Sequence, residues 1–210
     1  MLKYYLGMKI LIISDIHYYA EQLQKLKESV NLSEFSFAVC CGDLESSEVV
    51  DELANLGINV YAVPGNMDNY YILDMLEDYG ISIHGKVIRH DGRVVLAGIG
   101  GLAPLRAIED VVKKLNEVKE KGTKMIIVSH YPPFNTKVDL AYSGVHIGLE
   151  EISKLILDFK PYVVVCGHVH EAYGIDWIGE TLIINPGPLA WGRYAILELD
   201  KREVSMKTLD

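Results

Sequence analysis

Short apolar segments without polar alternation recur along the chain, and they constrain its fold more than any other feature. Residues 9–14 form the first, and similar segments follow at 35–41, 58–63, 124–129 and 162–166. A strand in which nearly every residue is apolar is covered on both faces, as in layered α/β folds. The sequence therefore predicts buried strands with helices packed against their sheets.

Segments with helical spacing of apolar residues separate these strands. We expect helices over residues 20–30, 46–56, 69–79, 106–121 and 149–159. Ser46 or Ser47 can cap the second of these helices through its hydroxyl group. Strands that alternate with helices in this way build parallel sheets.

Further strands of a different kind follow both halves of this pattern. They are expected at 81–83, 86–90, 93–99, 172–178, 181–184, 194–199 and 203–207. Asp91-Gly92 is a hairpin turn signal, so some of these strands run antiparallel. The sequence thus predicts an α/β protein with sheets of mixed direction.

Length and charge limit the class of protein. A chain of 210 residues fits one domain over residues 1–210, in which residues 1–7 could be an N-terminal extension because Met8 begins the first strand pattern. The formal net charge of −9 is the reverse of the basic surface that binds phosphate backbones. Binding of nucleic acid is therefore not expected.

The cysteines and the lengths of the apolar segments indicate a protein of the reducing cytoplasm. Cys40, Cys41 and Cys166 are odd in number and lack zinc-site spacing, so they are expected to be buried packing residues in a reducing cytoplasm. No segment approaches the roughly 18 apolar residues of a membrane span, and no leader pattern is present.

Metal-ligand residue types stand where the predicted buried strands end. They are Asp15, His17, Asp43, Asn66, His130, His168 and His170. Taken singly, such an Asp is usually a turn or cap residue, and such a His a core or surface residue. Ligands bind at the carboxyl ends of strands in open α/β sheets, however, so these side chains can converge. Oxygen and imidazole donors without thiolate suit Mn, Fe, Co, Ni or Zn better than calcium, and seven donors suit two ions about 3.5 to 4 Å apart.

Five sequence blocks now define a resemblance. They are Asp15-Ile16-His17, Gly42-Asp43, Gly65-Asn66-Met67-Asp68, His130 and Gly167-His168-Val169-His170, and in this order they resemble the motifs of the calcineurin-like metallophosphoesterase superfamily. The resemblance spans residues 10–188 and implies a four-layer α-β-β-α sandwich with a dimetal site at the C-terminal edge of the strands. It implies that Asp15, His17 and His170 hold one metal, that Asn66, His130 and His168 hold the other, and that Asp43 bridges them.

One position departs from the family pattern. The third block usually contains a histidine that protonates the leaving oxygen, whereas this chain has Met67, whose thioether cannot donate a proton. The chain therefore resembles a smaller branch that is associated with phosphodiester hydrolysis by a metal-bridging hydroxide, here held by Asp43. A general acid contributes typically 10²- to 10⁴-fold, so without one we expect diesters with good leaving groups, such as aryl or nucleotide-like diesters, to react best.

Other residues near these blocks are candidates for supporting roles. Asp68 is expected to cap the following helix, and His146, in an irregular loop, is a candidate acid. Tyr18, Tyr70 and Tyr131 are candidates for substrate contacts together with Asn66, because a tyrosine ring can stack on a base or an aryl group. His84 and His90 are expected on the solvated surface, and residues 98–147 carry the longest irregular stretches and could include a lid.

Three alternatives to a phosphodiesterase remain. A phosphomonoesterase is disfavoured by Met67, a nuclease by the acidic charge, and a non-catalytic interaction scaffold by the retention of all seven ligands. The expected partner is a small-molecule phosphoester substrate, without nucleic acid or membrane. Trp177, Trp191 and the C-terminal strands could form the interface of a homo-oligomer.

Overall fold

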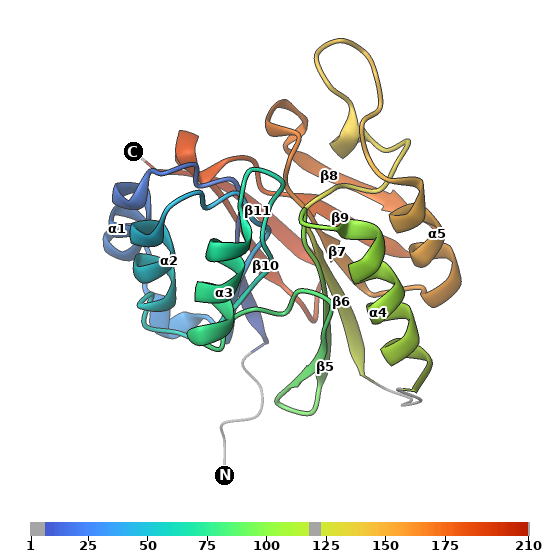
Figure 1. Cartoon of the computed structure of the whole chain (residues 1–210), viewed down its shortest axis with the longest axis horizontal. Helices are drawn as coiled ribbons and strands as arrows, with labels where there is room; N and C mark the ends of the chain where they lie inside the picture. The colour runs from blue at the N-terminus through green and yellow to red at the C-terminus, as the bar shows by residue number, and fades with distance from the viewer. Residues whose placement is uncertain (1–6, 118–122, 210) are drawn as a thin grey trace.

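The structure is a computed structural model that describes residues 7–117 and 123–209 (Figure 1). Most of the predicted N-terminal extension over residues 1–7 lies outside the described residues. The last residues of the helix predicted over 106–121 also lie outside the described residues. The described helix in this region covers residues 104–117.

Two mixed sheets form the centre of the molecule. In the described part of the chain, the first sheet has the strand order β11-β10-β1-β2-β3. Its strands are β1 (Lys9–Ile13), β2 (Phe37–Cys40), β3 (Val60–Ala62), β10 (Arg193–Glu198) and β11 (Glu203–Thr208). β1, β2 and β3 run parallel, whereas β10 pairs antiparallel with both β1 and β11. The N-terminal and C-terminal parts of the chain therefore build this sheet together.

The second sheet is formed by the middle of the chain, with the order β4-β5-β6-β7-β9-β8 among the described residues. Its strands are β4 (Val87–His90), β5 (Val94–Ile99), β6 (Lys124–Ser129), β7 (Val163–Val165), β8 (Gly174–Ile178) and β9 (Thr181–Asn185). The four central strands are parallel, and the edge strands β4 and β8 are antiparallel to their neighbours. Asp91 and Gly92 both have positive φ, at 51° and 65°, as the turn of a tight hairpin requires.

Helices cover the outer face of each sheet (Figure 1). They are α1 (Ala20–Ser29), α2 (Ser47–Ala54), α3 (Tyr70–Asp78), α4 (Pro104–Glu117) and α5 (Glu150–Phe159). The Ser46 side chain accepts a hydrogen bond from the Val49 N–H at the start of α2, as predicted. None of the described helices is both long enough and apolar enough to cross a membrane.

Three apolar cores separate the four layers. Along β1, Ile10 and Ile12 pack in the core between the two sheets, whereas Leu11 and Ile13 pack in the core beneath α1, α2 and α3. A third core, which contains Ile127 of β6, lies between the second sheet and helices α4 and α5. Each sheet is thus buried on both faces, which explains why its strands lack polar alternation. The predicted α-β-β-α sandwich is confirmed.

The predicted strand over residues 81–83 was wrong. Ser82 makes an isolated bridge to Ala62, and Ile83 donates its N–H to the carbonyl of the same residue. The Ala62 N–H also donates to the Ile81 carbonyl at 2.8 Å, so two hydrogen bonds hold this segment against the end of β3, but the segment is too short to continue a ladder. The apolar residues Ile81 and Ile83 pack against the cores without forming a strand.

The prediction that His84 and His90 lie on the solvated surface was also wrong. The Gly100 N–H donates to Nδ1 of His84 at 3.0 Å, and His90 Nδ1 lies 2.9 Å from the Tyr61 hydroxyl. Both histidines are half-buried, and burial lowers the pKa of each below its ordinary value. They are therefore neutral packing residues near pH 7.

The three cysteines are buried and free, as the sequence predicts. Burial raises the pKa of Cys40 to about 12, and it raises the pKa values of Cys41 and Cys166 as well. A thiolate is therefore not formed at neutral pH, and these side chains serve as small apolar residues.

Candidate metal centre

The predicted ligands lie at the carboxyl ends of strands from both sheets. Asp15 and His17 follow β1, Asp43 follows β2, and Asn66 follows β3 in the first sheet. From the second sheet, His130 follows β6 directly. His168 and His170 follow β7. Hydrogen bonds tie these loops together, since the Asp15 N–H donates to the Gly42 carbonyl at 2.9 Å and the Gly167 N–H to the His130 carbonyl at 3.0 Å. The expected convergence at one edge of the sandwich is therefore present.

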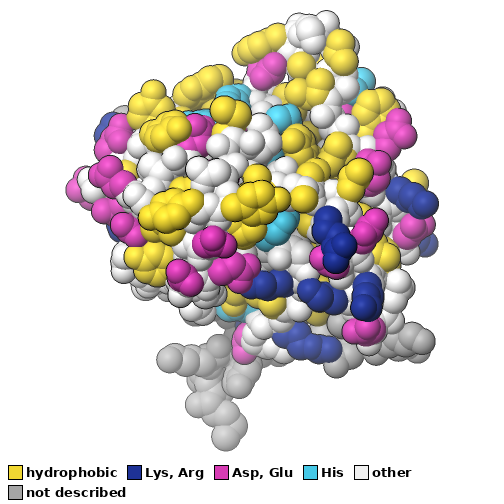
Figure 2. Space-filling view, in the orientation of Figure 1, with side chains coloured by type: hydrophobic (Ala, Val, Ile, Leu, Met, Phe, Trp, Pro, Cys, Tyr) yellow, Lys and Arg dark blue, Asp and Glu magenta, His cyan; other side chains and the backbone are white. Residues whose placement is uncertain are grey.

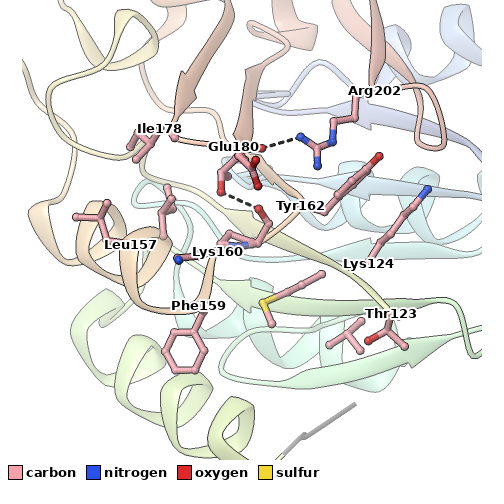
Figure 3. Close-up of a pocket in the computed structure, with 15 residues that line it drawn as sticks. Thr123, Lys124, Leu157, Phe159, Lys160, Tyr162, Ile178, Glu180 and Arg202 are labelled. Atoms are coloured by element: carbon pink, nitrogen blue, oxygen red, sulfur yellow. Dashed lines mark hydrogen bonds between the residues drawn. The ribbon is translucent and has the colours of Figure 1, made fainter. Parts of the chain in front are cut away.

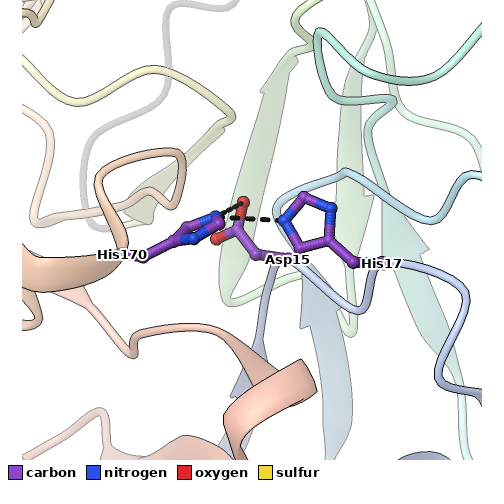
Figure 4. Close-up of side chains that lie close together, drawn as sticks. All are labelled: Asp15, His17 and His170. Carbon is purple, nitrogen blue, oxygen red and sulfur yellow. Dashed lines mark hydrogen bonds and ion pairs between the residues drawn. The ribbon is translucent and has the colours of Figure 1, made fainter.

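One group of donors consists of Asp15, His17 and His170 (Figure 4). The Nε2 atoms of His17 and His170 face one another at 3.0 Å, and His170 Nε2 lies 3.6 Å from Oδ1 of Asp15. Asp15 is 1% exposed, whereas the two rings are partly exposed. Two imidazole nitrogens and a carboxylate oxygen that point at the same small volume are typical of a transition-metal site.

A second group consists of Asp15, Asp43 and His130. His130 is buried, its Nδ1 is 2.8 Å from the Cys41 carbonyl, and its Nε2 is 2.7 Å from Oδ1 of Asn66. Nδ1 donates to that carbonyl, because a carbonyl oxygen only accepts, and this fixes Nε2 as the nitrogen directed toward the site.

Asp43 belongs to the second group and also lies near His17 of the first, and Asp15 is common to both groups. Its Oδ2 is 3.9 Å from Nε2 of His17, and its Oδ1 is 3.7 Å from Nε2 of His130. Oδ1 also accepts the Met67 N–H at 2.9 Å, and the side chain is almost fully buried. One carboxylate thus presents one oxygen to each group.

His168 is placed beside the second group rather than within it. Its ring centroid lies 5.1 Å from that of His130 and 4.6 Å from that of Tyr131, and its backbone N–H donates to the Asp15 carboxylate at 3.2 Å. Burial, together with the nearby His130 ring, lowers the pKa of His168 to about 4. The imidazole is therefore neutral at pH 7, which is the form that can ligate a metal.

The charges of this region fit a divalent cation. Burial raises the pKa of Asp43. Burial also acts to raise that of Asp15, but the hydrogen bond from His170 and the nearby His130 hold it below its ordinary value. Among the described residues, both carboxylates form ion pairs only with histidines. Buried carboxylates need a compensating charge, and a divalent cation bound among these donors would supply one.

Glycines in the motifs allow the loops to approach closely. A Cβ atom added to Gly65 would lie 1.9 Å from Oδ1 of Asp43, and one added to Gly167 would lie 1.9 Å from Oγ of Ser14. Four of the predicted ligands, Asp15, His17, Asp43 and His168, have positive φ between 47° and 68°. Residues held in this sparsely populated region concentrate at functional sites, because the surrounding contacts must enforce the conformation.

Asp68 does not cap α3, and this prediction was wrong. The cap is Asn69, whose side chain accepts the Ile72 N–H at 3.1 Å. Asp68 is buried, and its carboxylate accepts the N–H groups of Leu44, Glu45 and Gly65 at 2.9, 2.7 and 2.7 Å. It therefore joins the loop that carries Asp43 to the loop that carries Asn66.

We expect the substitution Asp68→Ala to lower the free energy of unfolding by about 3 kcal/mol or more, since it leaves three backbone donors without their acceptor. Urea unfolding of the metal-free protein, followed by circular dichroism, measures this change. Asp74→Ala, at an exposed position of α3, is the matched control and should change the free energy by less than about 0.5 kcal/mol. Equal free energies of unfolding for the two variants would contradict the role of Asp68 in joining the two loops.

Glu45 was not predicted as part of the site. Its carboxylate forms a short contact with Nδ1 of His17 and a hydrogen bond with Tyr18, which raises the pKa of that tyrosine. A carboxylate that accepts from Nδ1 orients the ring and leaves Nε2 free to ligate. The signal in the sequence was its position two residues after Asp43, in the block Gly42-Asp43-Leu44-Glu45.

His146 is held within its own loop. Its Nδ1 lies 2.6 Å from Oδ1 of the buried Asp139, and its ring contacts that of Phe134. Asp139 also accepts the N–H groups of Asn135, Thr136 and Gly148, so it organises the loop between β6 and α5. Within the described residues, the contacts of His146 go to this loop and to none of the seven predicted ligands. Its role as an acid stays a prediction without support from a contact.

Aromatic side chains lie beside some of the candidate ligands or close to them in sequence. Tyr18 is 62% exposed and Tyr70 is 65% exposed, whereas Tyr131 packs against the His168 ring. Trp191, which was not predicted as part of the site, is half exposed, with its ring centroid 5.4 Å from that of His170. Figure 2 shows hydrophobic side chains beside histidines along the upper edge of the molecule. Flat apolar surfaces are thus available next to the metal donors.

Comparisons with known proteins agree with this arrangement. A family model described as metallophosphoesterase, calcineurin superfamily, matches residues 44–209. An uncharacterised protein of Methanocaldococcus jannaschii is 33% identical over 92% of this chain and 93% of its own length. The 3′,5′-cyclic adenosine monophosphate phosphodiesterase of Escherichia coli is 25% identical over 85% of this chain and 75% of its own length.

Among solved structures, the protein TT1561 of Thermus thermophilus has a TM-score of 0.78 at 18% identity, and the match covers 97% of this chain and all of that one. The chain belongs to the metallophosphoesterases of the calcineurin superfamily. This confirms the family and the fold that the sequence blocks indicated. The superfamily consists of metal-dependent phosphoesterases, and the two donor groups are candidate ligands for divalent metal.

Proposed function

We propose that the chain is a metal-dependent phosphodiesterase that hydrolyses small or nucleotide-like phosphodiesters in the cytoplasm. In this proposal the two donor groups hold two divalent ions, and Asn66 and His168 complete the second group. The observation that carries the proposal is the position of Asp43, whose two carboxylate oxygens face His17 and His130 separately. A carboxylate between two sets of donors fits a bridging ligand.

Divalent ions at this place would supply Lewis acidity, which withdraws charge from the phosphoryl oxygens and lowers the pKa of water. The protein itself fixes the donors. Glu45 orients His17, the Cys41 carbonyl orients His130, and Asp68 joins two of the ligand loops. Such oriented, partly buried donors need little rearrangement during the reaction.

The absence of a proton donor at residue 67 favours diesters with good leaving groups. Met67 is 58% exposed, and its N–H donates to Asp43, so its side chain stands on the loop beside the donors without being able to protonate a leaving oxygen. The named activity of the E. coli relative, on a cyclic nucleotide diester, supports a nucleotide-like substrate. Tyr18, Tyr70 and Tyr131 are proposed to contact its base, since a stacked base contributes about 1 to 3 kcal/mol.

The test is hydrolysis of bis-p-nitrophenyl phosphate, a diester, beside p-nitrophenyl phosphate, a monoester. We expect turnover of the diester that needs added Mn, Fe, Co, Ni or Zn and disappears with a chelator, and we expect weak turnover of the monoester. Readdition of metal after chelation is the control, since it should restore the rate. Diester turnover that is unaffected by the chelator would contradict the metal-dependent mechanism. Strong monoester turnover by the unmodified protein would instead favour a phosphomonoesterase.

A further inference from the structure

A cavity of about 620 Å³ lies at the opposite edge of the second sheet from the metal donors (Figure 3). Lys124, the first residue of β6, lines it, whereas His130 follows the last residue of the same strand. Val95 and Thr181 line it from near the starts of β5 and β9, which run parallel to the strands beside them. The six residues of β6 span roughly 20 Å, so this cavity and the metal centre are separate sites.

The walls and size of the cavity resemble those of ligand sites. Apolar side chains from β5, β6, α5 and β8 line it, namely Val95, Met125, Ile156, Leu157, Phe159 and Ile178. Pockets for small organic ligands usually have volumes of about 300 to 1,000 Å³, mostly apolar walls and a few converging polar groups. This cavity has a volume in that range, and its walls are about half apolar and half polar.

The charged side chains on the cavity wall are mainly cationic. Lys124, Lys160 and Arg202 line the cavity together with one carboxylate, that of Glu180. Figure 3 shows the Tyr162 ring between Arg202 and Lys124. The guanidinium carbon of Arg202 lies 3.7 Å from the ring centroid, and Nζ of Lys124 lies 4.9 Å from it. A local excess of positive charge in a chain of net charge −9 indicates an anionic ligand.

Two of these cations have their charge available for a ligand. Lys124 pairs with Asp200, but in the described part of the chain neither Lys160 nor Arg202 pairs with a carboxylate. Arg202 is positioned by its Nη1 atom, which donates to the Glu180 carbonyl at 2.7 Å. That bond leaves the other N–H groups of the guanidinium for a carboxylate or phosphate.

We propose that this cavity binds an organic anion, with the apolar part of the anion against the α5 and β8 walls and its carboxylate or phosphate at Lys160 and Arg202. The inference does not depend on the proposed phosphodiesterase activity, because none of the cavity residues belongs to the metal centre. A fatty acid and a nucleoside monophosphate share the required chemistry.

The probe for the test is anilinonaphthalene sulfonate, an apolar anion whose fluorescence rises on binding. The titration uses chelator-treated protein, so that the metal centre does not contribute an anion site. We expect saturable binding to the unmodified protein. Arg202→Glu and Lys160→Glu should each raise the dissociation constant by about tenfold or more, because each removes a charge-assisted contact and adds a repulsive charge.

Lys154→Glu is the matched control, since Lys154 lies on α5 and does not line the cavity. The dissociation constant of the probe for this variant should stay within about twofold of that for the unmodified protein, since surface charges that do not contact the probe contribute little to its binding. Equal weakening by all three variants, or no weakening by Arg202→Glu and Lys160→Glu, would overturn the proposal. Displacement of the probe by decanoate supports a fatty-acid ligand, and displacement by adenosine monophosphate supports a nucleotide. Resistance to both competitors would also overturn it.

Discussion

The substitution Asp43→Asn is expected to lower kcat/KM for a diester by about three orders of magnitude or more, since metal stabilisation of the phosphoryl charge is worth several kcal/mol. Asparagine keeps the size of the side chain and one oxygen that can accept the Met67 N–H. It removes the negative charge and the second oxygen, so the amide can no longer present one anionic oxygen to His17 and another to His130. Steady-state kinetics with the diester substrate measure the change.

Metal content and folding must be measured on the same preparations. We expect Asp43→Asn to retain fewer bound ions per chain, by elemental analysis, with an unchanged near-ultraviolet circular dichroism spectrum. Asp74→Asn, an exposed position on α3, is the control and should retain both metal and activity. A variant at Asp43 that keeps its metal and its turnover would contradict the bridging role.

The second large effect is expected at Met67. Replacement by histidine places a proton donor on the loop beside the metal donors, and a general acid contributes about 10²- to 10⁴-fold. Hydrolysis of alkyl monoesters, whose leaving alkoxide must be protonated, should therefore rise by about 100-fold. Turnover of p-nitrophenyl phosphate and of bis-p-nitrophenyl phosphate should change little, because p-nitrophenolate leaves without protonation.

Met67→Leu separates the donated proton from the change of shape. It has no proton donor and a similar volume, so its monoester turnover should match that of the unmodified protein. A plot of rate against leaving-group pKa provides a second readout, since the slope should become shallower only in Met67→His. Equal rates for the histidine and leucine variants would show that residue 67 does not contact the leaving group.

Strand burial explains why most of the fold could be predicted from the sequence. Both faces of β1 and β6 meet apolar cores, so these segments are apolar throughout and end abruptly at polar residues. The change from apolar to polar residues at the end of each strand also predicts the positions of the candidate ligands, since a polar residue after a buried strand lies at the edge of the sheet. The segment Ile81-Ser82-Ile83 alternates apolar and polar residues as a strand can, but it makes only an isolated bridge to Ala62, and composition alone does not reveal how far a pairing extends.

The local sequence does not reveal the role of a residue whose hydrogen-bond partners lie in another segment of the chain. Asp68 and Asn69 are both good helix caps, and the choice between them depends on the backbone of Leu44 and Glu45, which lie in another loop. The position of Glu45 two residues after Asp43 does not by itself indicate its role, because its partner His17 lies in another loop. The surface prediction for His84 and His90 was wrong for the same reason, because their partners Gly100 and Tyr61 come from other segments of the chain.

The first sheet has a consequence for how the chain folds as it is synthesised. β1 lies between β2 and β10. β2 follows β1 closely in the sequence, so that edge of β1 can pair early in synthesis. The other edge can pair only after β10, near the end of the chain, has been synthesised. A nascent protein therefore exposes the apolar edge that carries the Asp15 loop until β10 arrives, and such an open edge is prone to intermolecular pairing. Release of a chain cut before residue 193 would leave that edge permanently open, and aggregation rather than a smaller folded enzyme is its natural fate.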